Sequence, residues 1–144
     1  MDDLGSGPVG IDTAIFIYYI EEHPKYFAPV RTLFTAIDKH RCRGVTSALT
    51  LLETLVVPYR AGDMAVAERY ELLFSRSRGI ELIDLDRALL RAAARIRAVY
   101  RLKTPDSIQL AAAFSKACTT FLTHDRPLSK VRGIKILQIG RYLA

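Results

Sequence analysis

Four acidic residues stand at positions where chemistry is plausible: Asp12, Glu53, Asp106 and Asp125. Asp12 ends the short apolar stretch VGID, and Asp125 ends the stretch TTFLTHD. Glu53 is the single acid of an otherwise apolar run, and Asp106 follows a Thr-Pro pair that begins another. Carboxylates at such positions are candidates for binding a hard divalent cation such as Mg²⁺ or Mn²⁺.

A cluster of these acids would need a cation. Two carboxylates 5 Å apart repel by roughly 3 kcal/mol at an effective dielectric constant near 20. A bound Mg²⁺ or Mn²⁺ removes this repulsion, lowers the pKa of a water, and stabilises the leaving oxygen in an in-line phosphodiester displacement. If the four acids converge, the sequence therefore predicts metal-dependent hydrolysis of a phosphodiester.

Each acid also has a purely structural explanation. Asp12 could cap the helix that follows it, and Asp106 could favour the positive end of a helix dipole. Asp125 could make an Asx turn, and Glu53 could be a buried acid with a hydrogen-bond partner. These explanations stay open for each residue alone, but they account less well for all four together.

Short β-branched runs alternate with longer helical patterns along the chain, which predicts an α/β fold with a largely parallel sheet covered on both faces. In such sheets, binding sites form outside the carboxyl ends of the strands, where the strand order reverses. Asp12, Asp106 and Asp125 are expected on that rim. The predicted strands are 9–12, 43–47, 80–84, 119–125 and 134–139, and the predicted helices are 13–22, 27–40, 48–60, 63–77, 86–101 and 105–116.

The helix expected at 48–60 is apolar around most of its circumference, which predicts a buried helix. Glu53 on a buried helix must find a partner or stay protonated at a cost in free energy. A cation is therefore expected close to its carboxylate.

Length and composition indicate one globular domain. The chain has 144 residues, 50% of them hydrophobic and 25% charged. We predict a flexible leader over residues 1–8, which contains Gly-Ser-Gly-Pro, and a single domain over 9–144. There is no apolar stretch near the roughly 20 residues that a membrane span needs, and no signal peptide. Cys42 and Cys118 are expected to be reduced thiols in a cytoplasmic protein.

Charge is distributed unevenly along the chain. Residues 1–86 carry 9 basic and 13 acidic residues, whereas residues 87–144 carry 12 basic and 2 acidic ones. The two acids of the basic part are Asp106 and Asp125. A polyanionic partner such as RNA is plausible for this part.

Arginines in the basic part are the candidate RNA-binding residues. Arg87, Arg91 and Arg95 fall on one face of the helix expected at 86–101, and Arg126 follows Asp125 directly. Neutralisation of phosphates by such side chains releases counterions and favours binding. A merely solvated helix face remains the alternative for the first three.

Histidine and aromatic residues give little sign of chemistry. His23, His40 and His124 share no spacing typical of a metal site or a catalytic triad. His124 lies next to Asp125 but is interpreted as a loop residue. The tyrosines and phenylalanines are mostly spaced as core residues and show no RNA-stacking motif.

With these residues in place, the sequence resembles the PIN-domain ribonucleases, and especially the VapC-type toxins of VapBC toxin-antitoxin pairs. The resemblance covers about residues 9–140 and follows four stretches in order. They are VGIDTAIFIYYI with Asp12, TSALTLLETL with Glu53, TPDSIQLAAA with Asp106, and FLTHDRPLSK with Asp125.

The resemblance implies a three-layer fold with a five-stranded parallel sheet flanked by helices, and Mg²⁺- or Mn²⁺-dependent cleavage of RNA. It implies a cognate antitoxin and a homodimer as well. Thr13 and Thr123 fall where small hydroxyl residues support the metal site. Ala14 and Leu128 depart from the family pattern, because a small polar residue and an aromatic are common at these positions.

The leading hypothesis is an endoribonuclease in which Asp12, Glu53, Asp106 and Asp125 hold the metal. An alternative is a PIN-like module that binds RNA or a protein without chemistry. A phosphoacceptor receiver domain would also use acids and Mg²⁺, but Asp2 and Asp3 precede the first strand, and IELIDLD offers no clear acceptor.

Overall fold

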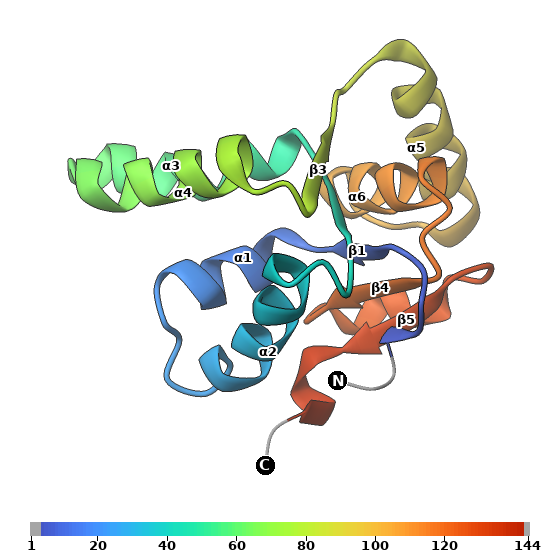
Figure 1. The fold of residues 1–144 in the computed structure, drawn as a ribbon. Helices are drawn as coiled ribbons and strands as arrows, with labels where there is room; N and C mark the ends of the chain where they lie inside the picture. The colour runs from blue at the N-terminus through green and yellow to red at the C-terminus, as the bar shows by residue number, and fades with distance from the viewer. Residues whose placement is uncertain (1–3, 143–144) are drawn as a thin grey trace.

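The computed structural model describes residues 4–142, and it contains five strands and six α-helices within that range (Figure 1). The α/β prediction is confirmed. The strands are β1 (Val9–Ile11), β2 (Gly44–Ser47), β3 (Ile80–Ile83), β4 (Thr120–Thr123) and β5 (Lys135–Gln138). The helices are α1 (Thr13–Ile20), α2 (Phe27–Asp38), α3 (Leu49–Ala61), α4 (Met64–Arg76), α5 (Arg87–Tyr100) and α6 (Thr104–Ser115).

All strand pairs are parallel, and the strand order is β3-β2-β1-β4-β5. The chain builds the sheet outward from β1 in one direction and then returns to add β4 and β5 on the other side. The order therefore reverses between β1 and β4. This reversal is the position at which open α/β sheets bind ligands, at the carboxyl ends of the strands.

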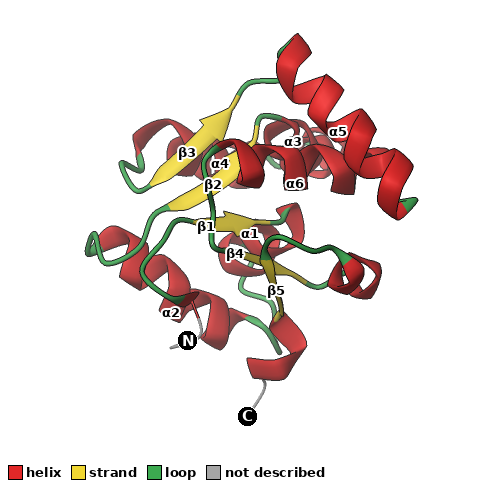
Figure 2. Ribbon diagram, turned by 90° about the vertical axis from the view of Figure 1, so that its right-hand side faces the viewer, coloured by secondary structure: helices red, strands yellow, loops and turns green. Residues whose placement is uncertain are grey.

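Helices cover both faces of the sheet, which makes three layers. Figure 2 shows the strands between α2 on one side and α5 and α6 on the other. Side chains of α1 and α2 pack on one face in a core that includes Phe16, Phe34 and Leu122. The opposite face packs Val45 and Phe121 against Leu110 of α6. The central strands β2, β1 and β4 are buried along their whole length, as expected for a sheet covered on both faces.

A glycine lets α6 lie close to β1. A Cβ atom added at Gly10 would come within 2.6 Å of the Phe121 ring and 2.8 Å of the Ala113 Cβ. Any larger residue would push the helix or the neighbouring strand away. The small residue therefore allows the close approach of α6 to the sheet at Ala113.

Helices α3 and α4 form an antiparallel pair that projects from the sheet (Figure 1). Gly62 joins them in the left-handed conformation, with φ 71°, and its N–H bonds to a carbonyl of the last turn of α3. The prediction that this helix is buried all round is wrong. Leu52 is 63% exposed and Val57 59% exposed, because the pair extends beyond the layers that would cover it.

Element boundaries agree with the sequence prediction to within two residues. Helix α6 begins one residue earlier than expected, with Lys103 at the N-cap and Thr104 as the first helical residue. Two 3-10 helices, η2 (Arg126–Lys130) and η3 (Ile139–Tyr142), were not predicted. Segments this short leave no hydrophobic periodicity to detect.

The prediction of a leader over residues 1–8 falls partly on residues 1–3, outside the described residues. Within the described part, Leu4 is buried and belongs to the core beside β1 and β4. Cys42 and Cys118 are free thiols. Among the helices of residues 4–142, none has both the length and the hydropathy that crossing a membrane requires.

Candidate active site

Asp12 lies at the carboxyl end of β1, beside β4. Its backbone N–H donates to the Leu122 carbonyl over 3.0 Å, so the strand pairing continues up to the acid itself. Asp12 is also the N-cap of α1, and its Oδ1 accepts from the Thr13 N–H at 2.9 Å. The second oxygen, Oδ2, accepts from the Thr123 hydroxyl at 2.6 Å. The capping explanation thus holds for one oxygen, while the other faces β4.

Burial is the main cause that raises the pKa of Asp12 above its usual value of 3.8. The hydrogen bonds from Thr123 and Thr13 lower the pKa, and the negative charges of Glu53 and Asp125 raise it further. Glu53 and Asp125, from distant parts of the sequence, therefore both lie within electrostatic range of Asp12. A cation at this place would relieve the cost of ionising them.

Asp106, on the first turn of α6, shares this environment. Its pKa is raised from 3.8 to about 7, first by burial, then by a hydrogen bond with Asp125, and then by the charges of Asp12 and Asp125. Lys103 lowers it in part. A hydrogen bond between two carboxyl groups needs one proton on the pair, and a bound cation could neutralise the same pair instead.

Thr123 links the two acids that end β1 and β4. Its hydroxyl donates to Asp12 Oδ2 and accepts from the backbone N–H of Asp125 at 3.0 Å. Gln138 on β5 donates to the Asp125 carbonyl at 3.0 Å and holds the loop after β4. Asp125 also begins η2 without any side-chain capping bond, so its carboxylate is not used in an Asx turn.

Glu53 reaches the same edge from α3. The Thr13 hydroxyl donates to Glu53 Oε1 at 2.7 Å, so Thr13 connects Asp12 and Glu53 as Thr123 connects Asp12 and Asp125. Glu53 is half-buried, and its partner in the described structure is this hydroxyl, not a cationic side chain.

A buried amide network holds Thr13 in place, and sequence reasoning missed it. Gln109 on α6 donates through Nε2 to the hydroxyls of Thr13 at 3.0 Å and Thr50 at 2.7 Å. Its Oε1 accepts from the Thr46 hydroxyl at 3.2 Å and the Ser47 N–H at 3.1 Å. A glutamine inside the apolar run SIQLAAA was the available signal, because a buried amide must be hydrogen-bonded.

The candidate acids are free of cationic partners within the described structure. Both ion pairs among residues 4–142 use Glu81, with Arg43 at 3.1 Å and Lys116 at 3.0 Å. In the same range, no three Asp, Glu, His or Cys side chains are already close enough together to hold a metal ion. The four carboxylates share one edge, and their all-oxygen chemistry fits a hard divalent cation. The metal assignment stays a prediction.

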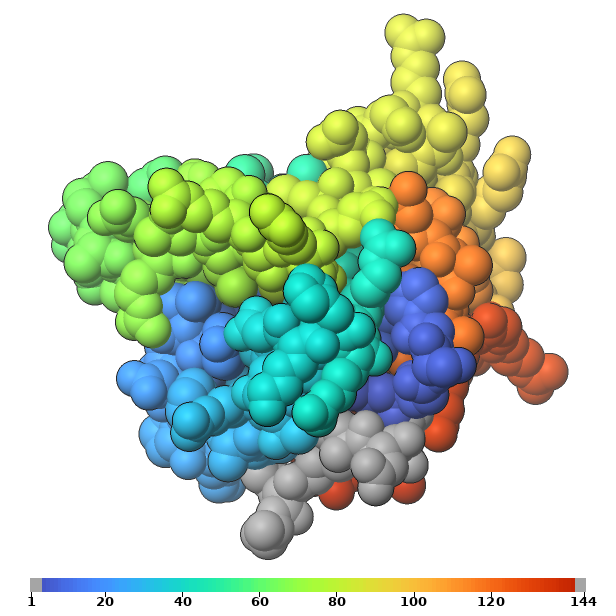
Figure 3. All heavy atoms as spheres, in the orientation of Figure 1, coloured from blue at the N-terminus to red at the C-terminus, as the bar shows by residue number. Residues whose placement is uncertain are grey.

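The predicted RNA-binding arginines are all exposed. Arg126 is the first residue of η2, directly beyond Asp125. Arg87, Arg91 and Arg95 lie on α5, and Figure 3 shows long side chains of this yellow-to-gold segment standing out from the surface. Lys103, which was not predicted, is the basic residue whose charge acts on Asp106.

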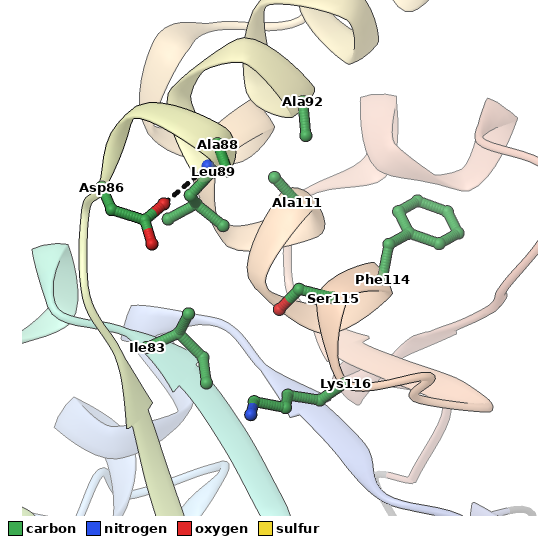
Figure 4. A pocket seen from close by; sticks show the side chains of 9 residues that line it. All are labelled: Ile83, Asp86, Ala88, Leu89, Ala92, Ala111, Phe114, Ser115 and Lys116. Atoms are coloured by element: carbon green, nitrogen blue, oxygen red, sulfur yellow. Dashed lines mark hydrogen bonds between the residues drawn. The ribbon is translucent and has the colours of Figure 1, made fainter.

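A separate hollow of about 480 Å³ lies between α5, α6 and the end of β3 (Figure 4). Ile83, Leu89 and Phe114 give it apolar walls, and Asp86 and Lys116 stand at its rim. Asp86 caps α5 through a 2.8 Å bond from the Leu89 N–H, and Lys116 is paired with Glu81. None of the four candidate acids lines it, so in the described structure this hollow is distinct from the candidate site.

The raised pKa of Asp106 predicts an unusual dependence of stability on pH. Between about pH 4 and pH 7, folded protein retains a proton that the unfolded chain has released, so the free energy of unfolding falls as pH rises through this window. Asp106→Asn removes this fall in the free energy of unfolding, because asparagine does not ionise. In EDTA at pH 8 this variant is expected to melt about 2–4 °C above the unsubstituted protein, and the gap should narrow toward pH 5.

Thermal melts from pH 5 to pH 8 measure this difference. Asp84→Asn, at an exposed loop position after β3, is the matched control and should show no such trend. A difference for Asp106→Asn that stays constant across the pH range would contradict the assignment.

The family model described as the PIN domain matches residues 9–134 of this chain. The matched range contains all four candidate acids. No curated protein sequence matches the chain significantly.

Solved structures share the fold at low sequence identity. VapBC2 from Rickettsia felis, bound to promoter DNA, has a TM-score of 0.70 and 14% identity, covering 90% of this chain and 97% of the other. DNA-bound VapBC from Salmonella typhimurium has a TM-score of 0.64 and 21% identity, covering 92% and 98%. Mycobacterium tuberculosis VapC20, a toxin that cleaves the sarcin-ricin loop, has a TM-score of 0.65 and 14% identity, covering 78% and 86%.

Proposed function

Because this chain belongs to the PIN-domain family, we propose that it is a metal-dependent endoribonuclease that hydrolyses RNA phosphodiester bonds. The observation that carries this proposal is the gathering of acids at one edge of the sheet, where Thr13 bonds to Asp12 and Glu53 and Thr123 bonds to Asp12 and Asp125. Within residues 4–142 the four carboxylates form no ion pair with a lysine or arginine, and the negative charges of Glu53 and Asp125 add to the effect of burial in raising the pKa of Asp12.

Asp12, Glu53, Asp106 and Asp125 would hold Mg²⁺ or Mn²⁺. When bound, the cation activates a water molecule and stabilises the charge that develops on the phosphate oxygens. Thr123 and Thr13 orient the carboxylates of Asp12 and Glu53 through their hydroxyl groups. Lys103, three residues before Asp106, and Arg126, directly after Asp125, are exposed and suited to bind the phosphates of the RNA.

The chain is proposed to act as the toxin of a toxin-antitoxin pair. Support comes from the toxin-antitoxin complexes and the RNA-cleaving toxin that share its fold. A cognate antitoxin, a homodimer and a cytoplasmic location belong to this proposal. The exposed apolar residues of α3, such as Leu52 and Val57, are consistent with a protein partner.

Cleavage and metal uptake test the proposal together. Purified protein should bind Mn²⁺ in calorimetry and release protons as it does so, because Asp106 must lose its proton for ligation. It should cut single-stranded RNA with Mg²⁺ or Mn²⁺ and lose all cleavage in EDTA. RNA binding without metal uptake or cleavage would instead support a non-catalytic binding module.

A further inference from the structure

Four aromatic rings from two distant parts of the sequence meet at the edge of the candidate site. Tyr18 and Tyr26 stack with centroids 4.9 Å apart, and His23 lies 4.8 Å from each of them. His124, which precedes Asp125, packs against the same two tyrosines, with centroids at 5.9 Å and 4.8 Å. These residues were not expected to cooperate from their spacing in the sequence.

The two tyrosines hold the His124 ring by its edge. The Tyr18 hydroxyl lies 2.7 Å from Nδ1, and the Tyr26 hydroxyl lies 3.3 Å from Nε2. A neutral imidazole has one N–H and one acceptor nitrogen, so one phenol accepts a hydrogen bond and the other donates one. Both ring nitrogens are thereby satisfied in either tautomer, and the orientation of the ring is fixed.

The two tyrosines contact the imidazole without stacking on it. The Tyr18 and Tyr26 rings meet His124 at interplanar angles of 69° and 63°, so neither tyrosine stacks on it. The side chain is exposed, although two hydrogen bonds hold it. A rigid aromatic face turned toward solvent is the kind of surface on which an unpaired base of single-stranded RNA stacks.

The position of His124 in the sequence places this surface next to the candidate acids. Thr123, on one side of His124, bonds to Asp12, and Asp125 follows on the other. Neighbouring Cα atoms lie about 3.8 Å apart, so the backbone of His124 is adjacent to a proposed metal ligand. Burial is the main cause that raises the pKa of Tyr18, and the charge of Asp12 adds to it, which places that phenol near the acids as well.

We propose that His124, held by Tyr18 and Tyr26, is a stacking site for the base of a nucleotide next to the phosphate bound at the acids. This inference rests on the proposed function for the identity of the ligand, single-stranded RNA. It adds a specificity-determining residue, and it predicts that the chain distinguishes a nucleotide with a base from an abasic one at this position.

Binding of a short single-stranded oligoribonucleotide tests the site, with protein carrying Asp106→Asn so that the RNA stays intact. His124→Ala should raise the Kd about tenfold, in the range of one lost base-aromatic stack. An oligoribonucleotide with an abasic nucleotide at the stacked position should bind equally weakly, and His124→Ala should weaken it no further. His124→Phe keeps a ring and should retain binding within about threefold.

Tyr59→Ala is the matched control, because Tyr59 is 52% exposed on α3, outside the four-ring cluster. It should leave the Kd unchanged. The stacking site is overturned if His124→Ala raises the Kd of the intact and abasic oligoribonucleotides by the same factor, or raises neither. It is also overturned if His124→Phe raises the Kd as much as His124→Ala does. Cleavage by the unsubstituted chain is measured separately. RNA that binds through His124 but is not cleaved would contradict the proposed nuclease activity and leave the stacking site standing.

Discussion

Replacing Asp106 by asparagine is expected to reduce RNA cleavage by more than about 100-fold while the fold is retained. Mutation of groups that only support metal ligands typically costs 10–100-fold in activity, and Asp106 is proposed as a ligand itself. Asparagine has nearly the same shape, and its amide N–H can still donate to Asp125, so the fold should tolerate it. It cannot supply the negative charge that a divalent cation needs.

Initial rates on a fluorescent single-stranded RNA measure the loss, at Mg²⁺ concentrations from micromolar to millimolar. Circular dichroism establishes that the variant is folded, and Asp84→Asn serves as the surface control. Calorimetry with Mn²⁺ should show weaker uptake by Asp106→Asn. If a folded Asp106→Asn protein cleaves RNA at the original rate with Mg²⁺, the assignment of this carboxylate is wrong.

Gln109→Leu is expected to have the second-largest effect, on activity and on stability together. Leucine fills a similar volume but removes the donor to Thr13 and Thr50 and the acceptor of the Ser47 N–H. Each buried polar group left without a partner costs about 1–3 kcal/mol. Thr13 would then orient Glu53 less firmly, and cleavage should fall about 10–100-fold, as is typical when support of a metal ligand is lost.

Two further variants separate orientation of Glu53 from general destabilisation. Thr13→Val removes the hydroxyl that donates to Glu53 and should weaken Mn²⁺ binding in calorimetry as Gln109→Leu does. Thr54→Val removes a buried hydroxyl of α3 that bonds to backbone carbonyls of its own helix. It should lower the melting temperature without changing Mn²⁺ affinity. Unchanged Mn²⁺ affinity in folded Gln109→Leu protein would show that the network serves the fold alone.

The position of the candidate acids in the fold could be predicted because it depends on local patterns. Asp12 and Asp125 follow short apolar runs, and Asp106 follows the Thr-Pro pair that begins α6. In a parallel sheet, strand ends and the starts of the helices that precede the next strands meet at one edge. Strand and helix periodicity in the sequence was therefore enough to place three acids on the same rim.

The exposure of α3 could not be predicted from its composition. An apolar circumference indicates a buried helix only when other layers surround it. The chain instead pairs α3 with α4 beyond the edge of the sheet, so Leu52 and Val57 face outward. How far a helix pair extends past a sheet depends on the whole packing arrangement, which residue spacing along one helix does not encode.

By itself, the sequence determined the order of strands and helices, the parallel α/β class and the strand ends at which acids stand. Only the tertiary structure decided how these acids are held. Thr123 bonds to Asp12 and Asp125, Thr13 bonds to Asp12 and Glu53, and Gln109 donates to Thr13. It also decided that two tyrosines bond to the ring nitrogens of His124. Thr13 and Gln109 are 96 positions apart, and Tyr18 and His124 are 106 apart. Periodicity reports which side of an element faces the core, whereas hydrogen bonds between such distant side chains depend on how the layers pack.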